Sequence, residues 1–321
     1  MNYRPLADTG IQVSEIALGC WPIAGMTSPG VNDADSIATI RACFDLGINL
    51  LDTAHMYGRT GESERLIARA LGSRRQEMVI ATKCGLVCSP EGRPIHDGRP
   101  ATLRRQCEES LKRLGTDHVE LLYLHAPDKD VPVSESAGGL RRLLKEGKTW
   151  AVGASNVTLA QLEEFAAACP LAAFQPPYNM LMRQIEADAL PWCREHGVAV
   201  LVYWPLLKGL LAGKIRRDYV FGLDDSRHKY PMFLGEERQK NHDLVDRLAV
   251  IARAAGHTVA ELVVNWTIHQ PGITVALCGA RRPEQICECA GGSGWQLTPA
   301  QCAEIDQALR ERGVADVRLP V

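Results

Sequence analysis

The sequence predicts a single domain over residues 1–321, folded as a (β/α)8 TIM barrel with an N-terminal β-hairpin and additional C-terminal helices. The first observation is a series of eight short apolar runs that alternate with segments of helical length, which is typical of parallel strands buried on both faces. The second is their number, because eight parallel strands are enough to close a barrel. The third is that no G-x-G-x-x-G motif follows the first run, as it would in an open dinucleotide-binding sheet.

The predicted elements follow one another in a regular order after a hairpin turn around Asp8-Thr9-Gly10. The strands are expected at residues 15–19, 48–52, 78–83, 119–125, 149–155, 171–175, 198–204 and 273–279. The helices are expected at residues 33–46, 62–71, 102–114, 134–145, 158–168, 184–196, 238–255 and 283–290. Two parts fall outside this repeat, a long loop at 214–237 and an extra helix at 258–269, and long loops at one end of a barrel often help to form its site.

Several helix boundaries carry their own signals. Asp33 is expected to cap the first helix, and Gly47 to end it in a left-handed turn. Gly115 and Gly197 are expected to end later helices in the same way, each just before a new apolar run. Thr298, followed by a proline, is expected to cap a last helix.

Composition excludes several classes of function. The formal charge is 36 − 38 = −2, and the basic residues form isolated pairs, so we expect no nucleic acid as a partner. No apolar run is long enough for a membrane span, and the first residues do not resemble a signal peptide. The eleven cysteines are scattered without the spacing of a zinc site, so we expect free thiols, no metal and a cytoplasmic location.

Candidate catalytic residues stand at the ends of successive predicted strands. Asp52, Lys83 and His125 each close one apolar run, and Tyr57 follows Asp52 by five residues. In a barrel of this kind the carboxyl ends of all strands converge on one mouth. We therefore expect these four side chains to lie around one pocket.

The four residue types together make an acid–base device. A tyrosine hydroxyl titrates near pH ~10, and a nearby ammonium such as Lys83 is expected to lower that pKa. Asp52 would hold Lys83 charged and in place, while His125 would orient a substrate oxygen. Taken alone, each residue has an ordinary structural explanation, such as a turn cap, a strand-end charge or a packing aromatic. Four titratable groups at one barrel mouth favour protonation of an oxygen that becomes an alkoxide.

A family resemblance rests on an ordered set of motifs that spans most of the chain. They are Asp52-Thr-Ala-His-Met-Tyr-Gly58, Glu62-Ser-Glu64, Ala81-Thr-Lys-Cys-Gly85, Leu124-His-Ala-Pro-Asp128, Gly153-Ala-Ser-Asn156, Gln175-Pro-Pro-Tyr-Asn179, Tyr203-Trp-Pro-Leu206, Gly209-Leu-Leu-Ala-Gly-Lys214 and Gly279-Ala-Arg-Arg-Pro-Glu-Gln285. In this order the motifs resemble those of the aldo-keto reductases. The resemblance implies a nicotinamide-dependent carbonyl reductase, in which Tyr57 is the general acid and Asp52, Lys83 and His125 complete the catalytic set.

The resemblance also implies where a nicotinamide cofactor lies. Ser155, Asn156 and Gln175 resemble the residues that hydrogen-bond its carboxamide, and Tyr203 resembles the aromatic that stacks on its ring. The other cofactor positions carried over from the family are Gly19, Cys20, Trp21, Asp52, Trp204, Pro205, Leu206, Lys208, Gly209, Gly279, Ala280, Arg281, Gln285 and Glu288.

The adenosine end of this set departs from the best-known members. Many of them have a Lys at the position of Gly279, an Arg at Gln285 and an Asn at Cys289, and the two cations help to neutralise a 2′-phosphate. Arg281 offsets their loss, because a guanidinium in the same loop can clasp a phosphate with two hydrogen bonds. We therefore expect NADP(H) rather than NAD(H), with dual use as the alternative.

Substrate contacts are expected from apolar walls around one polar focus. Trp21, Met26 and Leu86, with Trp204 nearby, would surround Tyr57 and His125, which suits small aldehydes, ketones or the carbonyl form of a sugar.

Two rivals stay open at this point. One is a cofactor-binding, redox-sensing regulatory subunit with little turnover, like the family's relatives that associate with potassium channels. The other is a barrel lyase or aldolase with Lys83 as a Schiff-base nucleophile. The expected partner is a small carbonyl compound, and the chain is expected to be a monomer or a small homo-oligomer.

Overall fold

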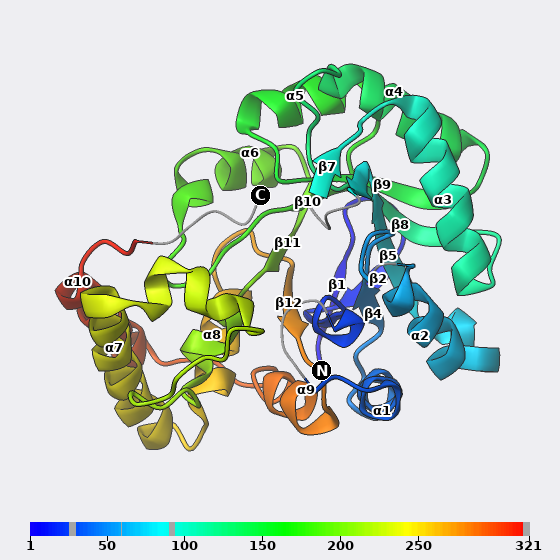
Figure 1. Ribbon diagram of the computed structural model, residues 1–321. Coiled ribbons are helices and arrows are strands. Elements are labelled where there is room, and N and C mark those ends of the chain that lie inside the picture. The colour runs from blue at the N-terminus through cyan, green and yellow to red at the C-terminus, as the bar shows by residue number, and fades with distance from the viewer. Residues whose placement is uncertain (26–29, 59, 90–93, 317–321) are drawn as a thin grey trace.

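Eight parallel strands close into a barrel, and helices surround it (Figure 1). The computed structural model describes residues 1–25, 30–58, 60–89 and 94–316. The order of strands around the barrel is β3-β4-β5-β8-β9-β10-β11-β12, so neighbours in the sheet are also neighbours along the chain. This arrangement confirms the predicted (β/α)8 barrel, and the antiparallel pair β1–β2 confirms the N-terminal hairpin.

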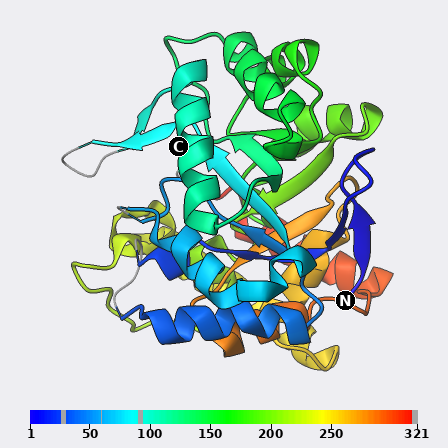
Figure 2. The same cartoon turned by 90° about the vertical axis from the view of Figure 1, so that its right-hand side faces the viewer.

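The strands are shorter than several of the apolar runs that predict them. The barrel consists of β3 (Ile16–Gly19), β4 (Leu50–Asp52), β5 (Val79–Cys84), β8 (Val119–Leu124), β9 (Thr149–Ser155), β10 (Ala173–Gln175), β11 (Ala199–Tyr203) and β12 (Val275–Gly279). Two hairpins lie outside it, β1 (Tyr3–Pro5) with β2 (Gln12–Ser14) and β6 (Leu86–Cys88) with β7 (Pro94–His96). Figure 2 shows these two hairpins at opposite ends of the barrel.

The helices lie close to their predicted positions. The α-helices are α1 (Asp33–Asp45), α2 (Glu62–Leu71), α3 (Pro100–Leu114), α4 (Val133–Lys145), α5 (Leu159–Ala168), α6 (Ala189–Glu195), α7 (Gly235–Ala254), α8 (Val259–Ile268), α9 (Pro283–Ala290) and α10 (Pro299–Arg312). Short 3-10 helices are η1 (Pro22–Ala24), η2 (Gly72–Glu77), η3 (Gln184–Ala187), η4 (Leu207–Ala212), η5 (Ser226–Lys229) and η6 (Pro231–Phe233). The segment predicted as a long loop at 214–237 therefore contains two short helices and the start of α7.

Helix caps agree with the sequence except at the first helix. Gly47 and Gly115 have φ angles of 69° and 67°, as expected for left-handed helix ends. Thr298 caps α10 through a hydrogen bond from the backbone N–H of Gln301. The predicted cap Asp33 is wrong, because Asn32 accepts the hydrogen bond that closes the first turn of α1, and Asp33 is already inside the helix.

Two separate apolar cores hold the barrel together, because successive strand residues point to opposite faces. The outer core fills the space between the strands and the helices. The inner core lies inside the barrel, where Tyr123 and Leu121 of β8 meet small and branched residues of the other strands. Leu6 and Val13 of the N-terminal hairpin, both fully buried, belong to this inner core and close it at the amino ends of the strands.

No single helix in the described part of the chain is long and apolar enough to cross a membrane, and the one pair that has the length and composition together, α7 with α8, is bent by 88°.

Candidate active site

The site begins where the inward-facing rows of the barrel leave the inner core. Leu50, Ala81 and Tyr123 belong to that core, and two residues further along their strands come Asp52, Lys83 and His125. Because the side-chain period of a strand is two, each of these polar residues continues an inward-facing row. The same step leads to Gly19, Ser155, Gln175, Tyr203 and Gly279 on the other strands.

A cavity of about 410 Å³ opens at this end of the barrel. Most of the residues predicted to bind substrate or cofactor line it, namely Gly19, Trp21, Asp52, Tyr57, Leu86, His125, Ser155, Asn156, Gln175, Tyr203, Trp204, Pro205, Leu206, Lys208, Gly209, Gly279, Ala280, Arg281 and Gln285. Residues from all parts of the chain thus meet at one hollow, which is the usual form of a small-molecule site.

An ion pair lies beneath the cavity floor. The Lys83 ammonium donates hydrogen bonds to Asp52 Oδ1 at 2.5 Å, to the carbonyl oxygen of Thr53 at 2.7 Å and to the hydroxyl oxygen of Tyr57 at 3.2 Å. Gln175 Nε2 donates to the other Asp52 oxygen at 2.7 Å. The Lys83 side chain is only 1% exposed, so these contacts replace water around its charge.

Burial changes the expected effect of Lys83 on Tyr57. Burial raises the pKa of Tyr57 well above its usual value, and the negative charge of Asp52 adds to that rise. The net shift is therefore opposite in direction to the lowering expected from Lys83. Tyr57 is held as a neutral phenol whose oxygen accepts from Lys83, which leaves its own proton free to be donated into the cavity.

His125 lies on the cavity side of Tyr57 as a neutral imidazole. Their rings meet edge to face with centroids 5.8 Å apart, and Trp21 contacts Tyr57 from another direction at 4.8 Å. Burial lowers the pKa of His125 well below its usual value, and the positive charge of Lys83 lowers it further. A neutral imidazole has one N–H donor and one acceptor, which suits contact with a neutral oxygen compound.

Polar side chains beside His125 are fixed by their own hydrogen bonds. Tyr203 donates from its hydroxyl to Asn156 Oδ1 at 2.7 Å, and Asn156 Nδ2 donates to the His125 carbonyl oxygen at 2.9 Å. The Ser155 hydroxyl donates to the carbonyl oxygen of Gln175 at 2.8 Å. The wall of the cavity is therefore ordered before any ligand binds.

Left-handed backbone is concentrated at the cavity. Among the described residues other than glycine, five have positive φ, and four of them line the cavity: Asn156, Trp204, Leu207 and Lys208. Such conformations cost about 1–3 kcal/mol each and are typical of functional sites. Around Leu207 and Lys208 they form a tight turn that continues into Gly209, of the kind whose N–H groups can bind a phosphate.

Positive side chains gather at the same end of the cavity. Lys208, Arg227 and Arg281 all line it, whereas Asp52 is the only lining residue with a carboxylate among the described ones. The Lys208 ammonium lies over the rings of Trp204 and Tyr230, 4.7 Å and 4.4 Å from their centroids. Burial lowers the pKa of Lys208 to about 8, and the charge of Arg227 contributes.

Three predicted site residues in the described part of the chain do not line the cavity. Lys83 lies behind it and contacts two residues that do line it, Tyr57 and Asp52. Cys20 is fully buried behind the floor, where its N–H donates to the Asp52 carbonyl oxygen at 2.8 Å. Glu288 forms an ion pair with Lys214 at 2.5 Å instead. Met26 lies outside the described residues.

Other lining residues escaped the sequence analysis: Pro22, Met56, Pro94, Arg227, Tyr230 and Leu277. Leu277 stands two residues before Gly279 on an inward-facing row, so it could have been found from strand parity, whereas Met56 belongs to the loop that carries Tyr57. Arg227 and Tyr230 come from the 214–237 segment, where no periodic pattern predicts which side chain turns inward.

No three His, Cys, Asp or Glu side chains within the described part of the chain lie close enough to share a metal ion.

Comparisons with known proteins agree with one another. The sequence profile of the Aldo/keto reductase family matches residues 15–310. The chain is 37% identical to the aldo-keto reductase YhdN of Bacillus subtilis, covering 98% of this chain and 96% of that protein. It is 35% identical to the NADH-specific methylglyoxal reductase of Escherichia coli, covering 96% and 99%. Among solved structures, the glycerol dehydrogenase AKR11B4 of Gluconobacter oxydans superposes with a TM-score of 0.89 at 36% identity, covering 97% and 96%.

Proposed function

Because the chain belongs to the aldo/keto reductase family, we propose that it reduces small aldehydes and ketones, or oxidises the matching alcohols, with a nicotinamide cofactor and with Tyr57 as general acid and base. When bound, the cofactor supplies the hydride from C4 of its nicotinamide ring. The observation that carries the proposal is the Tyr57 hydroxyl, whose oxygen is held by Lys83 and whose proton can be donated into the cavity.

The residues around Tyr57 have separate roles in proton transfer and in orienting the substrate. Tyr57 donates its proton to the substrate oxygen, and the Lys83 ammonium stabilises the phenolate that remains. Asp52 keeps Lys83 charged through the 2.5 Å contact. Neutral His125 donates a hydrogen bond that orients the substrate oxygen beside Tyr57.

The other walls of the cavity fit a nicotinamide cofactor. Ser155, Asn156 and Gln175 offer donors and acceptors to a carboxamide, and the Tyr203 ring, anchored by its hydroxyl, offers a face for the nicotinamide. The tight turn through Lys208 offers backbone N–H groups and an ammonium to the pyrophosphate.

For the adenosine end we favour NADP(H) over NAD(H). The argument is the charge of the lining: Lys208 and Arg281 are cations, and Arg227 is a third whose charge is paired with Asp225 at 2.6 Å, whereas sites that select NAD typically place a carboxylate at the ribose 2′-hydroxyl. A relative 35% identical is named as NADH-specific, so the choice depends on individual residues rather than on the family.

For the substrate we propose a small, uncharged carbonyl compound. Beside Tyr57 and His125, the substrate half of the cavity is lined by Trp21, Met56 and Leu86, which are apolar or aromatic. Methylglyoxal and glycerol are natural first tests, because relatives are named for them.

The compartment and the assembly are proposals as well. The ten cysteines whose side chains the structure describes are free thiols, which suits a reducing compartment such as the cytoplasm. We propose a monomer or a small homo-oligomer.

The two rivals have less support. The relatives compared above carry the names of enzymes, which gives no support to a regulatory subunit. A Schiff-base lysine needs a free lone pair, whereas Lys83 donates hydrogen bonds to three oxygens as an ammonium.

The test is a steady-state screen of NADPH and NADH with methylglyoxal, propanal, 4-nitrobenzaldehyde and glyceraldehyde, and of the oxidised cofactors with glycerol. We expect turnover with at least one pair, a loss of about 100-fold or more in kcat for Tyr57→Phe, and unchanged cofactor binding by fluorescence titration. Near-full activity of Tyr57→Phe excludes it as the acid. Cofactor binding without turnover of any compound favours the sensor.

A further inference from the structure

The loop that carries Tyr57 runs from the end of β4 to the start of α2, and we call residues 53–58 with 60 and 61 the Tyr57 loop. Backbone hydrogen bonds tie the loop to β5 and to the start of α2. The N–H of His55 donates to the Lys83 carbonyl oxygen at 3.0 Å, and the N–H of Ser63 donates to the Tyr57 carbonyl oxygen at 3.2 Å. These bonds hold the loop backbone at His55 and Tyr57, and other elements contact its outward side.

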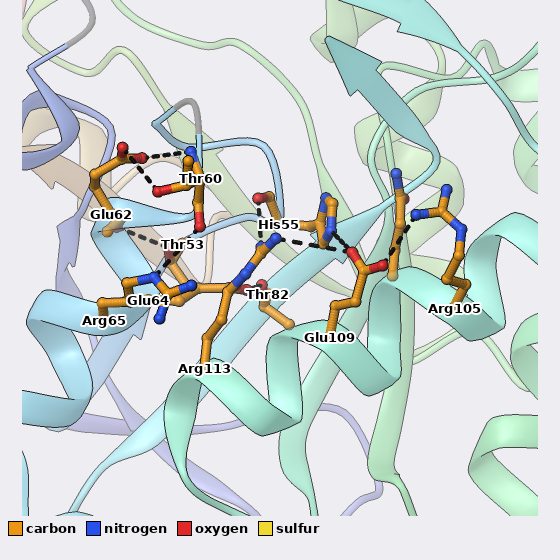
Figure 3. A network of polar contacts seen from close by, with 12 residues as sticks. Thr53, His55, Thr60, Glu62, Glu64, Arg65, Thr82, Arg105, Glu109 and Arg113 are labelled. Carbon is orange, nitrogen blue, oxygen red and sulfur yellow. Dashed lines mark hydrogen bonds and ion pairs between the residues drawn. The ribbon is translucent and has the colours of Figure 1, made fainter.

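A buried cluster of charges holds that outward side (Figure 3). Arg113 of α3 donates through Nη1 to the His55 carbonyl oxygen at 3.0 Å and to Glu64 Oε2 at 3.1 Å. Glu64 of α2 is fully buried, and its other oxygen accepts from the Thr82 hydroxyl at 2.8 Å. Thr82 precedes Lys83 on β5, so the cluster links the Tyr57 loop to the strand that carries Lys83.

The side chain of His55 is bound from the same helix. His55 Nε2 lies 2.6 Å from Glu109 Oε2, and Glu109 stands one turn before Arg113 on α3. Helix α3 thereby grips both the backbone and the side chain of one loop residue. Neither Glu64, Glu109 nor Arg113 lines the cavity, so none of them can touch a substrate there.

The packing leaves the loop little freedom. A Cβ atom at Gly61 would lie 2.5 Å from Arg113 Nη1, so the backbone rests directly on the guanidinium. A fully buried carboxylate such as Glu64 is costly unless its partners are well placed, and replacing such a pair by apolar residues is often neutral for stability. Stability alone therefore gives a weak reason for this cluster.

We propose that Arg113 and Glu64 are positioning residues that set the place of Tyr57 relative to Lys83. Arg113 holds the loop through the His55 carbonyl oxygen, Glu64 holds β5 through Thr82, and the ion pair between them joins the two supports. The quantity they set is the 3.2 Å contact between the Tyr57 hydroxyl and the Lys83 ammonium. This inference rests on the proposed role of Tyr57 as the acid.

The first test removes both charges together, so that neither is left buried alone. In the Glu64→Gln/Arg113→Met variant we expect kcat to fall about 10- to 100-fold, because small displacements of a reacting group have effects of that size. The KM for the aldehyde that the unmodified chain reduces fastest, and the Kd for NADPH, should stay within about threefold. Loss of packing alone would instead change KM, Kd and kcat together.

Arg105→Met is the matched control. Arg105 lies on the same helix and contacts the same Glu109 at 3.1 Å, but among the described residues it has no hydrogen bond or ion pair with the Tyr57 loop (Figure 3). This variant should keep the kcat of the unmodified chain. An equal loss in both variants would show that any change at Glu109 or on α3 has the effect, and would overturn the proposal.

Two further readouts separate positioning from folding. Hydrogen exchange of the cofactor-free chain should be about tenfold faster in peptides covering 55–63 of the double variant, and unchanged in α4 and α5. In Arg113→Ala, guanidinium ion at about 50 mM should restore part of kcat, whereas the same concentration of sodium chloride should not. If Arg113→Ala does not fold, kcat and hydrogen exchange of the Glu64→Gln/Arg113→Met variant still test the positioning role.

The outcomes distinguish this proposal from the proposed function. A kcat within threefold of the unmodified chain in the double variant, or faster exchange throughout the protein, overturns the positioning role. Full activity of Tyr57→Phe overturns the function instead, and the exchange of peptides 55–63 then still shows whether the cluster orders the loop.

Discussion

A protonated lysine has three hydrogens to donate, and Lys83 donates to Asp52, Thr53 and Tyr57. The consequence for Tyr57 is directional: its oxygen accepts, so its hydrogen points away from the lysine. Burial raises the pKa of Tyr57, so the phenol keeps its proton at neutral pH. The ammonium therefore acts mainly after proton transfer, when it stabilises the phenolate, rather than before it by making the phenol a stronger acid.

Cofactor choice should depend on Arg281. Its guanidinium lines the positive end of the cavity, and a charge-assisted contact to a 2′-phosphate is worth about 1.5–3 kcal/mol. Arg281→Ala should therefore raise KM for NADPH by about tenfold or more and KM for NADH by less than about threefold, measured with one aldehyde. Arg282→Ala is the control, because this neighbour is exposed and does not line the cavity. Equal weakening of both cofactors would show that Arg281 does not contact the 2′-phosphate.

Lys208 should make cofactor binding depend on pH. Burial lowers its pKa to about 8, so the ammonium loses its charge as the pH rises through that value. The Kd for NADPH should rise between pH 7 and pH 9.5, and Lys208→Met should flatten this dependence while weakening binding at pH 7. The control is Lys214→Met, whose ammonium pairs with Glu288 outside the cavity lining. A fluorescence titration with the same slope in the unmodified chain and in Lys208→Met would contradict the assignment.

The same shift has a defined sign for folding. The pKa of Lys208 is lower in the folded chain than in the unfolded chain. Below about pH 8 the side chain is charged in both states, and burying that charge destabilises the fold. That penalty fades as the pH rises from about 8 towards the ordinary lysine pKa.

Among the elements, those with a strong period were predictable and those shaped by single residues were not. The amphipathic pattern of α2 and α3 located both helices to within two residues. Hairpin β6–β7 was missed, because Leu86–Cys88 is only three residues long and shows no alternation of apolar and polar residues. The left-handed turn at Leu207 and Lys208 was also missed, because neither residue type favours positive φ.

Some residues of the site were likewise predictable from sequence and others were not. Residues on strand ends could be placed from sequence because parity fixes the side on which they point, as for Asp52, Lys83 and His125. Arg227 and Tyr230 could not, since they reach the cavity through tertiary packing of a long segment. Glu64 and Arg113 belong to the outer layer, where a buried ion pair looks in sequence like two solvated helix residues.

The first helix offers a test of how a cap is chosen. Asn32 has extended backbone and accepts from the N–H of Asp35 at 2.9 Å, whereas Asp33 forms an exposed ion pair with Arg69. Asn32→Ala should lower the free energy of unfolding by about 1 kcal/mol in urea titrations. Asp33→Ala should cost about half of that or less, because exposed pairs contribute little. The reverse order would restore Asp33 as the cap.

On the scale of the whole molecule, the barrel separates chemistry from stability along its axis. The carboxyl ends of the strands carry the cavity, while the opposite end is closed by the N-terminal hairpin, as Figure 2 shows. Between them lies the inner core, where Tyr123 fills the space beside Gly153: a Cβ there would lie 2.4 Å from the Tyr123 ring. The floor of the site therefore rests on a packed interior that cannot easily shift.

Leu6 tests this separation. Its side chain is fully buried in the inner core at the end remote from Tyr57, so Leu6→Ala leaves a cavity that the closed barrel cannot easily fill. We expect the free energy of unfolding to fall by about 2–5 kcal/mol. At temperatures where the variant stays folded, kcat should remain within about twofold, because the polar row above Tyr123 is held by its own hydrogen bonds. Asp8→Ala, at the exposed turn of the same hairpin, should change stability by less than about 0.5 kcal/mol. A large loss of kcat in folded Leu6→Ala would show that the two ends of the barrel are mechanically coupled, so that packing of the inner core also determines the place of Lys83.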